Sequence, residues 1–554
     1  MLTDLDRKYD AKLAEVTGPG GRLVIGRDDE GRAIVDNLPD NLPSLFRAFC
    51  SLYAETEAVV CGEERLTFAE LDSVSECVAH GLVAQGIAKG DRVAIAMRNC
   101  PSWIVSYMGI AKAGGIATLL NGWWEPAEME QAIRLSNPKL IIADGPRAKR
   151  IAERCSDCSV LSIPIDLPID DAMVELLHDR DENSALPELD PEDDATILFT
   201  SGSTGEAKGA LSTHRAVTTA TYAYATSLIV LRGILESEGN PPPTARTLLS
   251  VPLFHVTGEV PVMVNSFVIG RCMVVMPKWD VTEALRLIAK EGITYFVGVP
   301  TMSLELMNHP DREKYDLSSL RDITAGGAPR PISHVERLRQ EFPWAQPALG
   351  YGLTETNAAG FSNFWGNYAA KPASTGRPQV PFIEGAILGP DGSPLPTGET
   401  GEIAIRSAAN IKCYWNNPAA TATAFTQDGF FRTGDIGYFD EDGYLFIVDR
   451  KKEIIIRGGE NISAAEVEAA CYACPTVTEA SVFGAPDDRL GEIPVAVVVV
   501  KDGEQLEEQE LLRFLDGKLA KFKIPARVIF SASSLPRLGT GKIDRRALKA
   551  QYAH

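Results

Sequence analysis

The segment Thr200–Gly209 (TSGSTGEAKG) combines glycines, hydroxyl side chains and one lysine, directly after the apolar run 195–199, which predicts a buried strand. Glycines let backbone N–H groups approach an anion, and hydroxyls add donors without fixed charge, so the segment predicts a phosphate-binding loop. It matches neither the GxGxxG nor the GxxxxGKS/T pattern, because Ala207 stands where the latter needs its second glycine. A surface turn of the same composition is the alternative.

The elements that position this loop alternate between helices and strands. Helical patterns cover 42–55 and 66–86, and short apolar strands follow at 92–97, 115–120 and 139–144. The same strand pattern resumes between 246 and 327. This alternation predicts an α/β fold with mostly parallel sheets flanked by helices.

The texture changes twice in the second half of the chain. From about 376 to 449, DG and PTG turns separate short strands, which predicts a small antiparallel β-barrel or sheet. Residues 450–554 predict a compact α+β domain. We therefore expect a large N-terminal domain at 1–449, including the barrel subdomain and a polar, glycine-rich arm up to about residue 40, followed by the small domain.

Composition excludes several function classes. The 554 residues carry a formal net charge of -21 and are 45% hydrophobic and 23% charged, typical of a globular protein. Nucleic acid and anionic membranes need a basic face, so neither is expected as the main partner. We find neither an apolar signal region nor a run of about 20 apolar residues for an integral membrane segment, so we expect a cytoplasmic protein.

Two CxxC pairs, Cys155/Cys158 and Cys471/Cys474, raise the question of a zinc site. Neither has further ligands at suitable spacing, and the second pair lies in a run of helical period. We therefore expect these cysteines to pack in the core.

Six further segments follow the loop in the order of a known family: PLFHVTG (252–258), TAGGAP (324–329), GYGLTET (350–356), RTGD (432–435), VDRKKEIIIRGGENIS (448–463) and PRLGTGKIDR (536–545). With the loop they resemble the signature motifs of the adenylate-forming superfamily, the AMP-dependent synthetases and ligases, which contains acyl-CoA synthetases, luciferases and peptide-synthetase adenylation domains. The resemblance covers nearly the whole chain. The one departure is Ala207, where the family usually has proline, which affects loop rigidity.

The resemblance implies that ATP binds to residues from several of these motifs. Glu355 would hold Mg²⁺, Thr354 would bond the α-phosphate, and Asp435 and Arg450 would bind the ribose. The β- and γ-phosphates would be held by Thr200, Ser201, Gly202, Ser203, Thr204, Gly205 and Lys208. The adenine would lie between Tyr351 with Gly352 and a wall of Gly326, Gly327, Ala328 and Pro329.

The resemblance also assigns the catalytic and thiol-binding residues. Lys542 matches the lysine that bridges the substrate carboxylate and the α-phosphate, acting with Glu355 and Thr204; we expect it on an exposed loop. Gly458 and Gly459 would admit the pantetheine arm of coenzyme A. Lys452 matches a hinge about which a mobile C-terminal domain would swing between the two steps.

The acyl side is less charged. His255 resembles the residue at the mouth of the acyl pocket, which Val299, Gly350 and Ala358 would help to line. We see no lysine or arginine placed to meet a second carboxylate, which favours a fatty, aromatic or steroid-side-chain acid. The segment GWWEP at 122–126 resembles a variant found in ligases for such acids.

The resulting hypothesis is an ATP-dependent carboxylic acid–CoA ligase that uses ATP, Mg²⁺ and coenzyme A and forms an acyl-adenylate; a homodimer is compatible with it. One alternative is an adenylating enzyme that passes the acyl group to a carrier protein, against which the RGGEN segment (457–461) argues. The other is a non-catalytic nucleotide- or acyl-binding protein, which would be expected to lose Lys542 or Glu355.

Overall fold

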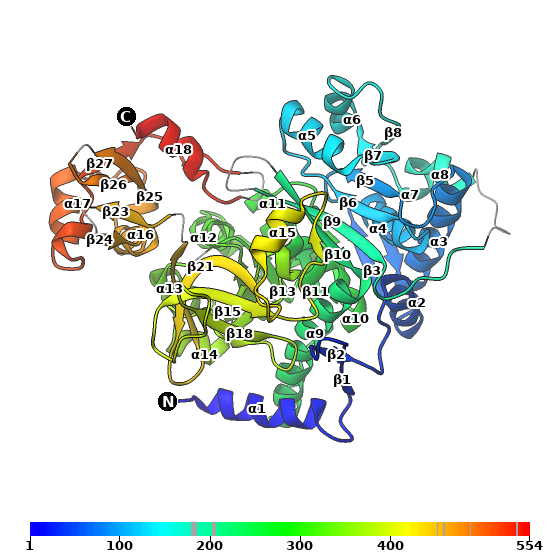
Figure 1. Ribbon diagram of the computed structural model, residues 1–554, viewed down its shortest axis with the longest axis horizontal. Coiled ribbons are helices and arrows are strands. Elements are labelled where there is room, and N and C mark those ends of the chain that lie inside the picture. Colours follow the sequence, from blue (N-terminus) through cyan, green and yellow to red (C-terminus); the bar gives the residue numbers. More distant parts are fainter. Residues whose placement is uncertain are drawn as a thin grey trace.

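The computed structural model describes residues 1–178, 185–201, 207–328, 330–450, 453–457, 460–487, 489–538 and 541–553. Within these ranges two large sheets form the core of the molecule, and two smaller sheets follow them in the chain (Figure 1). We call them sheets 1 to 4 in chain order of their main strands.

Sheet 1 is parallel around its centre, and its described strands have the order β20-β10-β9-β6-β5-β7-β8. The hairpin partner β10 of β9 is antiparallel to it. The strands are β5 (Arg92–Ala96), β6 (Ile116–Leu119), β7 (Leu140–Asp144), β8 (Val160–Ile163), β9 (Asp194–Ser201), β10 (Ala207–Thr213) and β20 (Cys413–Tyr414).

Sheet 2 has the order β17-β16-β15-β14-β13-β11-β12-β3-β4 in the described chain, and β15 to β3 run parallel. Its strands are β3 (Glu57–Cys61), β4 (Glu64–Thr67), β11 (Arg246–Leu249), β12 (Cys272–Val275), β13 (Tyr295–Gly298), β14 (Asp322–Gly326), β15 (Gln346–Tyr351), β16 (Phe361–Phe364) and β17 (Arg377–Pro378).

Helices cover both sheets, as the alternating pattern predicts. They include α2 (Leu42–Leu52), α3 (Phe68–Ala84), α4 (Pro101–Lys112), α5 (Pro126–Ser136), α6 (Gly145–Ala152), α7 (Ile169–Ala172), α8 (Val174–His178), α9 (His214–Ser237), π-helix η1 (Gly258–Val264), α10 (Asn265–Ile269), α11 (Val281–Glu291), α12 (Pro300–Asn308), α13 (Ile332–Glu341) and α14 (Trp365–Ala370). Local signals start them: the side chains of Thr67 and Glu70 form a capping box at α3, and Asp280 caps α11.

Sheet 3 is the segment that predicts a small barrel or sheet. It is antiparallel, with the order β18-β19-β21-β22, and the described strands show no pairing between β18 and β22 that would close a barrel. Its strands are β18 (Glu384–Leu388), β19 (Gly401–Arg406), β21 (Phe431–Phe439) and β22 (Leu445–Arg450), with α15 (Pro418–Ala424) beside them.

Sheet 4 lies to one side of the large sheets in Figure 1, in orange and red, and has a core of its own. Its strands are β23 (Ile455–Arg457), β24 (Glu460–Ile462), β25 (Val477–Asp487), β26 (Gly491–Val500) and β27 (Arg527–Ser531), with α16 (Ala464–Tyr472), α17 (Glu508–Leu515) and α18 (Arg545–Tyr552). Cys471 and Cys474 pack in this core, as expected.

The segment expected as a polar, glycine-rich N-terminal arm contains regular structure. Residues Asp4–Thr17 form helix α1, followed by the short strands β1 (Ile25–Arg27) and β2 (Ala33–Val35). Leu13 and Val16 bury one face of α1 against the main core. The overall polar composition of the segment does not reveal this apolar face. Among the described helices, none is long and apolar enough to cross a membrane.

Candidate active site

The predicted nucleotide residues meet where two neighbouring strands end. Gly326 ends β14 and pairs in register with Gly350 near the end of β15, whose last residue is Tyr351. A ligand site at the carboxyl ends of parallel strands is the expected place in an open α/β sheet. The chain then turns into the single-turn helix η3 (Thr354–Thr356), which carries Glu355.

Sheet 3 adds a carboxylate and a guanidinium to this edge. The Tyr351 hydroxyl donates to Asp435 Oδ2 at 2.6 Å, and Arg450 Nε lies 3.3 Å from Asp435 Oδ1. Asp435 and Arg450 face each other in register on β21 and β22. Burial raises the pKa of Asp435, and the charge of Arg450 opposes that shift. The result is a buried acceptor suited to two vicinal hydroxyls.

Glu355 lies beside the strands that lead into the phosphate loop. Its Oε1 accepts a hydrogen bond of 2.8 Å from Tyr414 Oη, and the Lys208 ammonium lies 5.0 Å from the centre of the Tyr414 ring. Lys208 pairs in register with Thr200 across β9 and β10. Burial raises the pKa of Glu355, while the charges of Arg450 and Lys208 oppose the shift. The carboxylate keeps acceptor capacity on Oε2, which fits a hard cation such as Mg²⁺.

Lys542 reaches the same edge from the C-terminal segment. A Cβ added to Gly327, whose φ is +74°, would lie 3.0 Å from Lys542 Cε, so the ammonium arm passes directly over that glycine. Burial lowers the pKa of Lys542 to about 8, helped by the charge of Arg450 and opposed by Asp435. The expectation of an exposed loop is wrong, because Lys542 is half-buried against sheet 2.

The predicted acyl-side residues are themselves uncharged, but the cavity beside Val299 is also lined by Arg98, Arg147, Lys278, Glu305 and Arg537. Thr257 N–H donates to His255 Nδ1 at 3.2 Å, and burial, with the charge of Lys542, lowers the pKa of His255 to about 3, so its imidazole is neutral. Val299 precedes α12 and lies beside a cavity of about 140 Å³, which Gly541 also lines. Ala358 has a φ of +64°, and its carbonyl accepts from Tyr224 Oη at 2.6 Å.

The structure adds contacts that the motifs do not contain. Tyr414 and Tyr224 lie outside every motif segment. Because a single tyrosine has no recognisable sequence pattern around it, neither could be predicted as a site residue. Gly352 is explained by close approach, since a Cβ there would lie 1.9 Å from the Ala358 carbonyl oxygen. Thr354 begins η3, and Ala328 is a half-buried residue directly after Gly327. Outside the described residues lie Gly202, Ser203, Thr204, Gly205, Pro329, Lys452, Gly458, Gly459 and the side chain of Ser201.

Known proteins resemble this chain over most of its length. Residues 46–415 match the family model of AMP-binding enzymes, and residues 466–542 match that of the AMP-binding enzyme C-terminal domain. The chain is 34% identical to the long-chain-fatty-acid–CoA ligase FadD13 of Mycobacterium tuberculosis (strain ATCC 25618 / H37Rv) over 88% of this chain and 93% of that one. It is 34% identical to a feruloyl-CoA synthase of Amycolatopsis sp over 89% and 96%.

Solved structures show the same architecture. ATP-bound MatB from Rhodopseudomonas palustris superposes with a TM-score of 0.82 at 29% identity, covering 93% of this chain and 99% of that one. A Mycobacterium tuberculosis fatty acyl CoA synthetase gives a TM-score of 0.71 at 31% identity, covering 93% and 98%.

Proposed function

The chain belongs to the AMP-binding enzyme family and is an AMP-forming, ATP-dependent acid–CoA ligase; on that premise we propose which residues do the chemistry and which class of acid they take. The observation that carries the proposal is the position of Lys542 over Gly327, within electrostatic reach of Asp435. A lysine from the C-terminal segment thereby lies at the strand ends where a nucleotide would bind.

In the first step, the substrate carboxylate attacks the α-phosphate of ATP and pyrophosphate leaves. Asp435, Arg450 and Tyr351 hold the ribose and base, so that the α-phosphate faces Lys542. The Lys542 ammonium offsets the negative charge that develops between the two anionic reactants. Lys208 and Thr200 hold the departing phosphates. Glu355 would hold Mg²⁺, which would supply further charge neutralisation.

In the second step, the thiol of coenzyme A attacks the acyl carbonyl and AMP leaves. We propose that residues 450–554 form a mobile domain that carries Lys542 away after the first step, with Lys452 as hinge and Gly458 and Gly459 beside the pantetheine arm. Its separate core supports this division. A Gly459→Leu enzyme should form the adenylate and fail to make the thioester; normal CoA turnover would place the thiol elsewhere.

We propose an acid with an apolar tail. His255 is neutral, and Val299, Gly350 and Ala358 offer no charge for a second carboxylate. Relatives that act on fatty acids and on ferulate, by their names, support this class.

The test is release of AMP and pyrophosphate from ATP with Mg²⁺ across a panel of carboxylic acids, each with and without coenzyme A. We expect the accepted acids to give AMP only when coenzyme A is present. We also expect apolar acids to react faster than dicarboxylic acids. Pyrophosphate release that coenzyme A leaves unchanged would point to a carrier protein as acceptor. A preference for dicarboxylic acids would overturn the proposal of an acid with an apolar tail.

We also propose a cytoplasmic location, supported by ten cysteines that are all free thiols. A homodimer stays a prediction, and sedimentation analysis of the purified chain tests it.

A further inference from the structure

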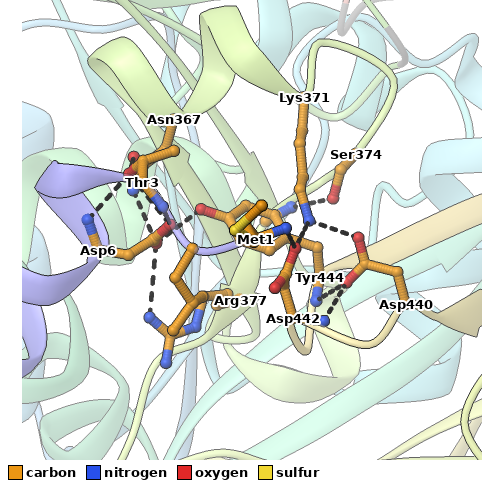
Figure 2. A network of polar contacts seen from close by, with 12 residues as sticks. Met1, Thr3, Asp6, Asn367, Lys371, Ser374, Arg377, Asp440, Asp442 and Tyr444 are labelled. Carbon is orange, nitrogen blue, oxygen red and sulfur yellow. Dashed lines mark hydrogen bonds and ion pairs between the residues drawn. The ribbon is translucent and has the colours of Figure 1, made fainter.

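Asp6 on helix α1 is a buried carboxylate far along the chain from every site residue. The residue is 1% exposed, and it lies on a helix whose neighbours are α9 and α14. Asp6 Oδ1 accepts from Tyr444 Oη at 2.7 Å and from Asn367 Nδ2 at 2.9 Å (Figure 2). Tyr444 lies in the turn between β21 and β22, whereas Asn367 lies on α14, directly after β16. Asp6 therefore links the β21–β22 turn of sheet 3 to the helix that directly follows β16 of sheet 2.

Ion pairs reinforce this junction. Lys371 Nζ lies 2.5 Å from Asp440 and 2.7 Å from Asp442, both in the β21–β22 turn, and Figure 2 shows the lysine reaching toward them from the segment after α14. Arg377 pairs with Asp10 of α1 at 2.9 Å. We call Asp6, Asn367, Tyr444 and Lys371 the α1 junction. Because Asp6 and Tyr444 are almost fully buried, each hydrogen bond lost there leaves a desolvated polar group.

The same two sheets also meet at the nucleotide site. There Tyr351 of sheet 2 donates to Asp435 of sheet 3. Between that contact and the α1 junction, the rings of Phe361 on β16 and Phe439 on β21 lie 5.8 Å apart, and Phe361 also lies 6.1 Å from Tyr351. Phe439 directly precedes Asp440, the ion-pair partner of the junction residue Lys371. One continuous seam thus connects the nucleotide site to α1.

We propose that α1 positions the nucleoside site: the α1 junction sets how sheet 3 lies against sheet 2, and thereby the spacing of Tyr351 and Asp435. Asp6 is a positioning residue and does not touch the substrate. The proposal rests on the assignment of Tyr351 and Asp435 to the nucleoside. A shift of about 1 Å between groups that hold a substrate is enough to weaken a site strongly, even when its cause lies far away.

The experiment compares wild type with Tyr444→Phe and Asp6→Asn. We expect the Kd for AMP, measured by isothermal titration calorimetry, and the KM for ATP to rise about three- to tenfold, with the KM for the acid and kcat at saturating ATP unchanged. The matched controls are Tyr438→Phe, whose ring stacks on Phe446 in the same hairpin, and Asp4→Asn, an exposed carboxylate on the same helix. Both controls should bind AMP as wild type does.

A second background makes the test specific. In an Asp435→Ala enzyme the ribose contact is already lost, so adding Tyr444→Phe should weaken AMP binding no further. Lowered melting temperatures with unchanged AMP affinity, or an equal loss in both backgrounds, would overturn the positioning role. If Asp6→Asn does not fold, Tyr444→Phe, which removes one hydroxyl, decides alone. Wild type that does not bind AMP would instead refute the nucleotide assignment itself.

Discussion

On the proposed nucleotide side of the site, polar groups from separate elements bond one another; on the proposed acyl side, Val299, Gly350 and Ala358 carry no charge and the imidazole of His255 is neutral. Tyr351, Asp435 and Arg450 form a chain of contacts across two sheets, and Glu355 is bonded to Tyr414. Charges acting on phosphates must hold a fixed geometry, so substitutions there should cost most. Apolar contacts select by shape, and one methylene is worth only about 1–3 kcal/mol.

Of all the substitutions, Lys542→Ala should reduce activity most. A smaller loss than on the acyl side would contradict the difference between the two sides. We expect acid-dependent pyrophosphate release to fall about 10²- to 10³-fold, because a charge directed at the developing anion is lost. The fold should persist, since alanine fits beside Gly327 where the lysine arm passed.

The matched control is Lys549→Ala on α18, an exposed lysine 3.7 Å from Glu492. It should keep full activity. Unchanged pyrophosphate release in the Lys542→Ala enzyme would remove this lysine from the first step.

Glu355→Gln should have the next largest effect, about 10- to 100-fold on kcat/KM, with a higher Mg²⁺ concentration needed for half-maximal rate. Glutamine still accepts the hydrogen bond from Tyr414, so the fold should survive. Titration of the rate with Mg²⁺ measures the change. Tyr414→Phe keeps the carboxylate and should cost less. A Mg²⁺ dependence equal to wild type would show that the metal is held elsewhere.

Most of the division into a nucleotide side and an acyl side could be predicted from the sequence. The motif residues directly follow short apolar strands, and the ends of such strands meet in an α/β fold. Gly326 and Tyr351 lie at such ends. The environment of Lys542 could not be predicted, because Gly327 and Asp435, which surround it, are distant in the chain. The same holds for α1, where the buried Asp6 looks like an ordinary surface charge until its partners Tyr444 and Asn367 are known.

The pH dependence sharpens the nucleotide side. The pKa of Lys542 is lowered to about 8, so its ammonium is fully present below that pH and is lost as pH rises through it. We expect kcat/KM for ATP to fall about tenfold between pH 7 and 9. Arg450→Gln removes a charge that lowers this pKa, so the alkaline limb should move to higher pH. Asp435→Asn removes an opposing charge and should move it to lower pH. If the alkaline limb of the pH profile stays at the same pH in both variants, the charges of Arg450 and Asp435 do not act on Lys542.

Substitutions on the acyl side should have the smallest effects, confined to the choice of acid. His255→Leu and Val299→Ala should change the ratio of kcat/KM between short and long acids by about 2- to 10-fold, since they change the shape and polarity of the acyl side and remove no charge. The KM for ATP should stay at the wild-type value. Because the pKa of His255 is about 3, the imidazole stays neutral and this preference should not change between pH 5 and 7. A His255→Leu enzyme with a raised KM for ATP would place the imidazole on the nucleotide side, and the two regions could no longer be treated as separate.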